Sequence, residues 1–594
     1  MTAATEIRQA RNEPSFLGNW LHSPWKSMVI PYAICILAQT PYLLLYFTQL
    51  FKLRPHYQFF PFALLATALA IFVRWPRNQE HPFRRSLFSS LMFLVGCLFG
   101  LAAALFSDPW FSAVSAFAFV TSFCARTKDG ETGQTMLSAS LPLWVALSLP
   151  LNVDFSLITW LQVFSAQAAS HVLDLLGYHH HLAGTVLTFP ARSYGVEEAC
   201  SGVQSFFTLL FMSTVFVVFL HRPWFRSLLL LCSALFWAIL MNAVRILLIP
   251  IADISFGFDL ASGFNHAALG YVVLAFGGLL VLSTDQFLTF LFGPVETATM
   301  DSSNEAVGNI TGFWNRFVAG ESPETPAKVR SKLPSRFARM MIAGGAACML
   351  LLGLLSIGTA TRMLSSGYIV KFFRDTQPVA MEKNDLKEEI GAWRWISETE
   401  TDKPYQVLTR EKASDLGLRS DLWTYRASTY RAIFALDQPF PGWHELTRCY
   451  QNTGWDVVEQ GRQYKEAMNP DGRNWPYIQV EMTMPTGEKG FLLFSFFDVR
   501  GEPFDAPTGW GTLNKFFIRV RNRLAPEIRE RLFNAESYQV QIFVRGSRSL
   551  TELERDAVRE NYLVLREELR TAFLKRHSEG AKGAATPVAS VDAK

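Results

Sequence analysis

Residues 226–250 read RSLLLLCSALFWAILMNAVRILLIP, and this stretch decides the class of fold. A helix that spans a bilayer needs roughly 20 apolar residues, which this run supplies. It also carries Arg245 and, three residues earlier on the same helical face, Asn242. An ionisable residue at membrane depth costs about 2.5–3.5 kcal/mol on insertion scales. We therefore expect a membrane helix that contains a functional arginine.

Similar apolar runs occur on both sides of this helix. We expect a polytopic α-helical membrane protein with about 8–10 transmembrane helices. The candidate spans are 28–50, 59–75, 86–106, 109–125, 134–151, 204–221, 226–250, 267–292 and 338–361.

The composition agrees with a membrane part joined to a water-soluble part. Half of the 594 residues are hydrophobic and 18% are charged, against about 25% in an average soluble protein. The mean hydropathy of +0.15 is high for a globular chain but low for one that is membrane throughout. The net charge of +4 is small and spread along the chain, so no nucleic-acid partner is expected.

Lys and Arg residues in the connecting loops predict the orientation in the membrane. The basic loop 293–337 is expected in the cytoplasm, with the N-terminus, whereas the loop 251–266 contains no Lys or Arg and is expected outside. Lys52 and Arg54 in the first loop are exceptions to this scheme. Everything after residue 362 is then extracytoplasmic.

One apolar stretch, 155–176, does not fit as a further crossing. Its polar residues include Gln162, Gln167, His171 and Asp174. We expect an amphipathic helix at the outer surface or a re-entrant segment.

Charged residues become frequent after about residue 365, which indicates a soluble domain of mixed α/β type. Alternating runs at 477–484, 490–499 and 538–544 predict strands, and 549–575 predicts an amphipathic helix. The expected organisation is a cytoplasmic segment (1–27), a transmembrane catalytic domain (28–292), a cytoplasmic linker (293–337), a last transmembrane helix (338–361), an extracytoplasmic domain (365–577) and a disordered tail (578–594).

Cys200 in VEEACSGVQSF stands just before the expected helix 204–221. The N-terminus of a helix stabilises a thiolate, and the small residues Ser201 and Gly202 allow another backbone to approach. Glu198 opposes thiolate formation by its like charge, so a cation must outweigh it. A buried structural cysteine is the plain alternative.

His266 in SGFNHAALG stands at the outer start of the helix 267–292. The predicted orientation brings Cys200, Arg245 and His266 to the same membrane face. A thiol nucleophile, an imidazole base and a guanidinium beside a developing oxyanion form a set for acyl transfer. Taken singly, Arg245 could snorkel to the head groups and His266 could cap a helix.

The remaining candidates indicate no metal or other cofactor. The consecutive His179, His180 and His181 are expected in a solvated loop. Either Asp253 or Asp259 could orient His266, although loop-solubilising charge is the better interpretation. Gly277 and Gly278 predict close helix packing.

These motifs resemble the exosortase/archaeosortase family. The resemblance rests on ACSG at 199–202, NAVR at 242–245 and NHAALG at 265–270, in this order at helix edges. It implies Cys200, Arg245 and His266 as catalytic residues, with Asn242, Ser201, Gly202 and Glu198 in support. It also implies a multi-pass transpeptidase of the bacterial cell inner membrane, with its C-terminal domain in the periplasm. The implied substrates are proteins with C-terminal sorting signals of the PEP-CTERM type, which pass to an unknown acceptor nucleophile, often in exopolysaccharide producers.

The C-terminal part resembles the exosortase-associated domain through GWHELTRCYQNTGWDV, residues 442–457. In that domain a Pro usually stands two residues after the His, whereas Leu446 follows His444 at that distance here. The fused arrangement is similar to the exosortase U subtype. The alternative function, from another class, is a non-catalytic membrane component of polysaccharide or protein export with an outer binding domain.

Overall fold

The fold is seen in a computed structural model, which describes eighteen segments of the chain. They are 26–76, 83–84, 86–130, 134–150, 153–190, 192–195, 203–293, 311, 313–315, 318, 336–365, 378–398, 402–414, 417–427, 430–441, 446–463, 475–503 and 536–584. The chain forms two compact units, one of residues 1–172 and 196–366, the other of residues 173–195 and 367–594. We call them the helical unit and the strand-rich unit and describe each by itself.

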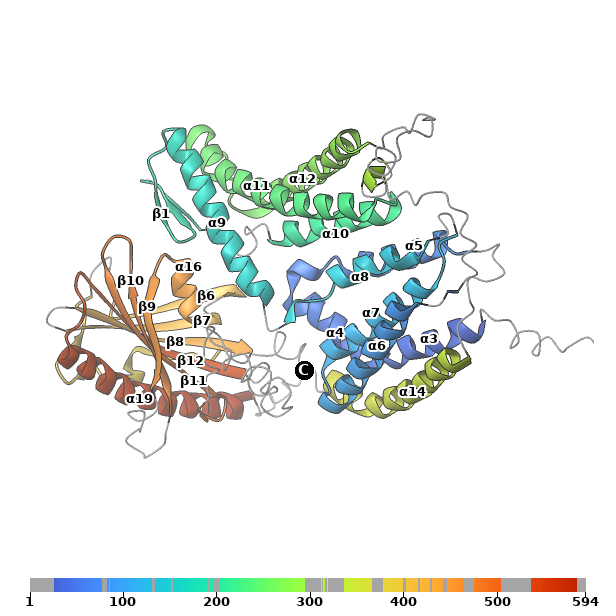
Figure 1. Ribbon diagram of the computed structural model, residues 1–594. Helices are drawn as coiled ribbons and strands as arrows, with labels where there is room; N and C mark the ends of the chain where they lie inside the picture. The colour runs from blue at the N-terminus through green and yellow to red at the C-terminus, as the bar shows by residue number, and fades with distance from the viewer. Residues whose placement is uncertain are drawn as a thin grey trace, which may run out of the picture. The chain divides into compact units, whose positions relative to one another are not determined.

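The helical unit consists of α-helices and two short 3-10 helices, η1 and η2 (Figure 1). In chain order they are α3 (Lys26–Ala38), α4 (Thr40–Leu53), η1 (Pro55–Tyr57), α5 (Phe60–Val73), α6 (Leu87–Phe106), α7 (Pro109–Arg126), η2 (Met136–Ser140), α8 (Leu141–Val145), α9 (Val153–Leu175, which continues into the other unit), α10 (Val203–Phe219), α11 (Trp224–Phe256), α12 (Gly263–Leu291) and α14 (Arg336–Ser365).

Four described helices, α6, α11, α12 and α14, are long and apolar enough to cross a membrane. The run expected at 28–50 is a pair of helices, α3 and α4, bent by 55°. Pro41 stands in the first turn of α4, where it cannot donate a backbone hydrogen bond. The bend therefore has a local cause, and the pair makes a fifth candidate span.

Four other expected spans differ from this pattern. The expected spans at 59–75, 134–151 and 204–221 contain apolar helices that are too short to cross a membrane. The span expected at 109–125 corresponds to α7, which is long enough but is made more polar by its serines and Arg126. The chain is a multi-pass membrane protein, and the number of eight to ten crossings remains a prediction. Residues 155–176 lie in one helix, α9, which is not among the candidate spans.

Glycines bring α10, α11 and α12 into close contact. A Cβ at Gly277 would lie 3.1 Å from Leu209 on α10 and 3.5 Å from Met241 on α11, and a Cβ at Gly278 would lie 3.1 Å from Met212. The glycine pair of α12 therefore permits the close packing that the sequence predicts.

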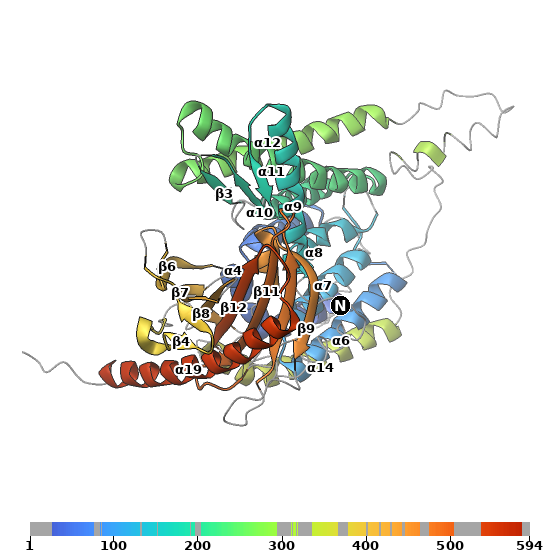
Figure 2. The same ribbon diagram turned by 90° about the vertical axis from the view of Figure 1, so that its left-hand side faces the viewer.

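The strand-rich unit is built on an antiparallel sheet of nine strands with the order β4-β5-β7-β8-β12-β11-β10-β9, and β6 pairs with β7 (Figures 1 and 2). The strands are β4 (Glu389–Ile390), β5 (Trp393–Trp395), β6 (Tyr405–Ser414), β7 (Gly417–Arg426), β8 (Arg431–Pro441), β9 (Asp456–Gln463), β10 (Tyr477–Thr483), β11 (Lys489–Asp498) and β12 (Glu536–Gly546). The three predicted strands correspond to β10, β11 and β12.

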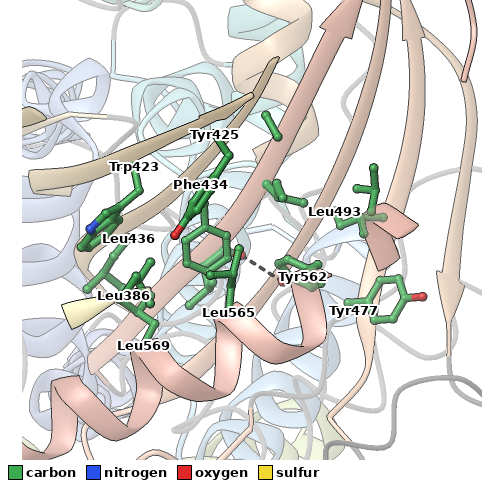
Figure 3. Packing of buried hydrophobic residues seen from close by; sticks show 14 of the residues in the cluster. Leu386, Trp423, Tyr425, Phe434, Leu436, Tyr477, Leu493, Tyr562, Leu565 and Leu569 are labelled. Atoms are coloured by element: carbon green, nitrogen blue, oxygen red, sulfur yellow. Dashed lines mark hydrogen bonds between the residues drawn. The ribbon is translucent and has the colours of Figure 1, made fainter. Parts of the chain in front are cut away.

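The long helix α19 (Glu552–Ala584) covers one face of this sheet. Tyr562, Leu565 and Leu569 point from α19 into an aromatic core that includes Trp423 and Phe434 of the sheet (Figure 3). Because α19 continues to Ala584, residues 578–584 are helical rather than part of a disordered tail.

A small sheet from the middle of the chain belongs to the same unit. Its strands are β1 (His181–Ala183), β2 (Val186–Thr188) and β3 (Ser193–Gly195). Gly454, which follows α16 (Leu446–Asn452), has a φ of +96°, and a Cβ there would lie 2.9 Å from the backbone of Ala183 and Gly184. The small sheet and the turn after α16 therefore touch backbone to backbone.

Candidate active site

Arg245, in the second half of α11, meets His266 in the first turn of α12. Arg245 is 8% exposed, and its Nη2 donates a hydrogen bond to His266 Nε2 at 2.9 Å. The same Nη2 lies 3.4 Å from the backbone oxygen of His266. Two of the three residues in the predicted catalytic set are thus in direct contact.

The second ring nitrogen of His266 defines its tautomer. His266 Nδ1 lies 3.0 Å from the carbonyl oxygen of Leu260, which can only accept a hydrogen bond. Nδ1 therefore carries the proton and Nε2 accepts from Arg245. A backbone carbonyl therefore holds the ring in place.

Asp259, in the turn before His266, makes several hydrogen bonds within that turn. The Asp259 carboxylate accepts hydrogen bonds from the Ala261 amide and the Ser262 hydroxyl, both at 2.7 Å. The Asp259 carbonyl accepts from the Asn265 side chain at 3.1 Å. Asp259 thus shapes the turn that presents His266, which is more than a solubilising charge would do.

Gly270 leaves room for the guanidinium. A Cβ at this position would lie 3.2 Å from Arg245 Nη2 and 3.4 Å from its Cζ. Gly270 is the last residue of the NHAALG motif, but no role was predicted for it from the sequence. Its spacing of four residues from His266, one helical turn, was the signal available.

Asn242 contributes a buried amide on the same face as Arg245. It is 3% exposed, and neither its Nδ2 nor its Oδ1 has a hydrogen-bond partner in the part of the chain that the structure describes. Burying an unsatisfied amide costs about 1–3 kcal/mol. Such a group is suited to bind a polar group of a substrate.

The start of α10 lies toward the same end of the packed helices as Arg245 and His266. Leu209, Met241 and Gly277 mark one level of the three packed helices. With a rise of about 1.5 Å per residue, the Cα atom of Arg245 lies about 6 Å and that of Val203 about 9 Å from this level, toward the same end. Cys200, Ser201, Gly202 and Glu198 lie outside the described residues.

A second buried polar cluster was missed by sequence reasoning. Asp154, at the start of α9, is fully buried; it forms an ion pair with Arg54 and accepts a hydrogen bond from His56 Nε2 at 3.2 Å. This ion pair explains why Arg54 departs from the loop-charge pattern, since its charge is neutralised inside the protein. The three residues come from segments about 100 positions apart, and no sequence signal connects them.

The consecutive histidines show no metal-like arrangement. His180 Nδ1 lies 2.9 Å from the carbonyl oxygen of Tyr178, and its ring stacks on Phe189. Within the described segments, no group of three His, Cys, Asp or Glu side chains is placed to hold a metal ion.

Comparison with protein families gives one match. The family described as transmembrane exosortase matches residues 52–283, which contain Arg245, His266 and the Asp154 cluster. No curated protein and no solved structure matches the chain.

Proposed function

Since residues 52–283 belong to the transmembrane exosortase family, we propose that this chain is a membrane-embedded cysteine transpeptidase or protease. It cleaves C-terminal sorting signals of exported proteins through a thioester and transfers the product to an acceptor. The observation that carries the proposal is the 2.9 Å contact between Arg245 Nη2 and His266 Nε2, formed toward the end of the helices at which α10 and α12 begin.

The proposed reaction uses Cys200 as the nucleophile. Its thiol gives up a proton to an imidazole, a role that the family resemblance assigns to His266, and the sulfur attacks the substrate carbonyl carbon. Arg245 is buried and hydrogen-bonded to His266, so its guanidinium can stabilise the oxyanion of the tetrahedral intermediate. The carbon–nitrogen bond then breaks, the leaving amine takes the proton, and a thioester remains until the acceptor attacks it.

Chain connectivity supports Cys200 in this role. It stands three residues before Val203, so its Cα atom lies within about 11 Å of the Val203 Cα atom. Val203 itself lies toward the same end of the packed helices as the Arg245–His266 pair. Asn242, on the same face, is available to bind the main chain of an extended substrate.

The setting that we propose is the bacterial inner membrane, with the strand-rich unit in the periplasm. The substrates are exported proteins with a PEP-CTERM-like tail, which combines a short motif, a transmembrane helix and a basic cluster. The transmembrane helix of such a substrate would dock among the helices of the helical unit.

The test is processing of a tail-bearing substrate that is co-expressed with the enzyme. Cys200→Ala should abolish processing, whereas Cys232→Ala, which changes an exposed cysteine on α11, should retain it. Normal processing by the Cys200→Ala variant would favour the non-catalytic export component instead.

A further inference from the structure

A buried arginine lies between the start of α6 and the end of α7. Arg126, the last residue of α7, is 2% exposed. Its Nε donates a hydrogen bond to Ser89 Oγ and its Nη2 donates one to Ser90 Oγ, both at 3.0 Å, and both serines stand in the first turn of α6. Within the described segments, no carboxylate forms an ion pair with this guanidinium. Its buried positive charge therefore meets only neutral hydroxyl groups.

The serines hold the guanidinium in place without neutralising it. Ser89 Oγ donates to the Ser122 carbonyl of α7 at 2.8 Å, so its lone pairs are left to accept from Arg126. Ser122 Oγ in turn donates to the Ser89 carbonyl at 2.6 Å, which ties α6 to α7 at this level. A guanidinium has five N–H donors, and its two bonds to serines use two of them. Donors of Arg126 thus remain for a further acceptor.

The acid that is nearest to Arg126 in the sequence is engaged with other cations. Asp129 is 1% exposed, and its Oδ2 lies 3.7 Å from Arg74 Nη1 and 3.8 Å from His221 Nε2. A buried charge costs free energy unless an opposite charge lies beside it. An anion from outside the chain would supply that opposite charge at Arg126.

Other groups at this end of α6 and α7 are also positive. The backbone amide of Arg84 donates to the Arg126 carbonyl at 2.9 Å, and the Arg84 side chain is exposed. Lys128 follows two residues after Arg126. The first turn of α6 contains no acidic residue, and the N-terminus of a helix favours anions. The local field therefore attracts negative charge.

The site lies at a membrane boundary. The helix α6 is a candidate span of 20 residues, whose length of about 30 Å matches the hydrocarbon core, so its first turn stands at one edge of that core. Leu87, Leu91 and Leu94 of α6 are large apolar residues that are 88%, 53% and 52% exposed. Ser90 is exposed too, three residues from Leu87 and four from Leu94, which places it on the same helical face. The hydrogen bond from Arg126 to Ser90 therefore borders the lipid-facing side of α6.

From these observations we propose that Arg126 and Ser90 bind the phosphate group of an anionic membrane lipid, whose acyl chains lie against Leu87, Leu91 and Leu94. A guanidinium matches a phosphate in geometry and forms charge-assisted hydrogen bonds with it. The apolar face that continues from Ser90 favours a lipid over a free phosphate ion. This site goes beyond the proposed function and does not depend on it.

The test is native mass spectrometry of the full chain in detergent with added dimyristoyl phosphatidylglycerol. We expect the unmodified protein to retain one tightly bound copy of this lipid. Dimyristoyl glycerol, which has the same acyl chains and no phosphate, should not compete for the site. The Arg126→Gln variant should bind the phospholipid about tenfold more weakly or worse, because it loses charge-assisted hydrogen bonds.

Arg339→Gln is the matched control. A Cβ at Gly345 of α14 would lie 2.7 Å from Phe93 of α6, and a Cβ at Gly100 of α6 would lie 2.7 Å from Met349 of α14. Residue numbers thus rise in the same direction along the two helices, so both helices begin at the same end. Arg339 is exposed in the first turns of α14, and its loss removes the same charge from that end. Its substitution should leave lipid binding unchanged.

Three results would overturn this assignment. The first is equal affinity of Arg126→Gln and the unmodified protein for the phospholipid. The second is equal affinity of the unmodified protein for dimyristoyl glycerol, which would reduce the site to an apolar surface; this comparison holds even if Arg126→Gln does not fold. The third is displacement of the phospholipid by inorganic phosphate, which would make the site one for free anions.

Discussion

Gly454 offers a sharp test of the contact between the small sheet β1–β3 and the rest of the strand-rich unit. A Cβ at this position would lie 2.9 Å from the carbonyl carbon of Ala183 and from the amide nitrogen of Gly184. Reaching an ordinary contact requires a backbone shift of about half an ångström, and overpacking of this kind costs about 1–3 kcal/mol. The perturbation is Gly454→Ala.

A second glycine separates this steric effect from backbone strain. Gly487 has a φ of +90°, close to the +96° of Gly454, but a Cβ there would meet nothing within 4 Å. Both substitutions to alanine carry the strain of a left-handed residue, about 1–2 kcal/mol. Only Gly454→Ala also pushes against Ala183 and Gly184.

The assay is hydrogen exchange of peptides that cover residues 181–195 in the full chain. If the contact contributes about 1–3 kcal/mol, Gly454→Ala should accelerate their exchange by about 5- to 150-fold relative to Gly487→Ala. Equal exchange in the two variants would refute the steric argument. So would acceleration confined to the peptides around residue 454.

Three further predictions follow from other contacts. The Arg245→Lys variant should not process the substrate, because an ammonium lacks the planar fork of donors of a guanidinium. Substrate cleavage in cells measures the processing. Gly277→Val should destabilise the helical unit by about 1–3 kcal/mol, because the added side chain would clash with Leu209. Gly344→Val on α14, where a Cβ meets nothing within 4 Å, should have no such effect, and thermal unfolding in detergent compares the two variants. Burial raises the pKa of Tyr562 to about 12, above its value near 10 in an unfolded chain. The corresponding contribution to the free energy of unfolding, about 2–3 kcal/mol, is therefore present below pH 10 and is lost as the pH rises toward 12. Denaturant midpoints between pH 9 and 12 should fall more steeply for the unmodified protein than for Tyr562→Phe, and parallel curves would contradict this.

The sequence predicts well whatever a local pattern determines. The apolar runs 477–484, 490–499 and 538–544 correspond to strands β10, β11 and β12. Successive side chains of a strand point to opposite faces, and in β11 both faces are buried, since Leu493 belongs to one core and Leu492 to the other. Loop charges assigned Arg245 and His266 to the same membrane face, and the two side chains are in contact in the structure.

Long-range arrangements were not accessible in the same way. The Leu260 carbonyl that holds His266 is a backbone group, which every residue type has, so the sequence does not indicate this contact. The pairing of Asp154 with Arg54 and His56 joins two distant segments. Residues 181–195 belong to the strand-rich unit because of contacts such as Ala183 with Gly454, which composition and periodicity do not reveal.

The last apolar helix of the chain, α14, packs among the first ones. Its Thr359 shares a hydrogen bond with Tyr42 of α4 at 2.7 Å, a Cβ at its Gly345 would lie 2.7 Å from Phe93 of α6, and Met349 contributes to the same core as Tyr32 of α3.

This arrangement has a consequence for biogenesis. The ribosome delivers α3 and α4 to the membrane about 300 residues before α14 emerges, so the seam that α14 fills stands open during about half of synthesis. Until then lipid or an insertion factor must cover the apolar groove beside Phe93. Assembly of the helical unit is therefore completed after translation of α14 rather than helix by helix.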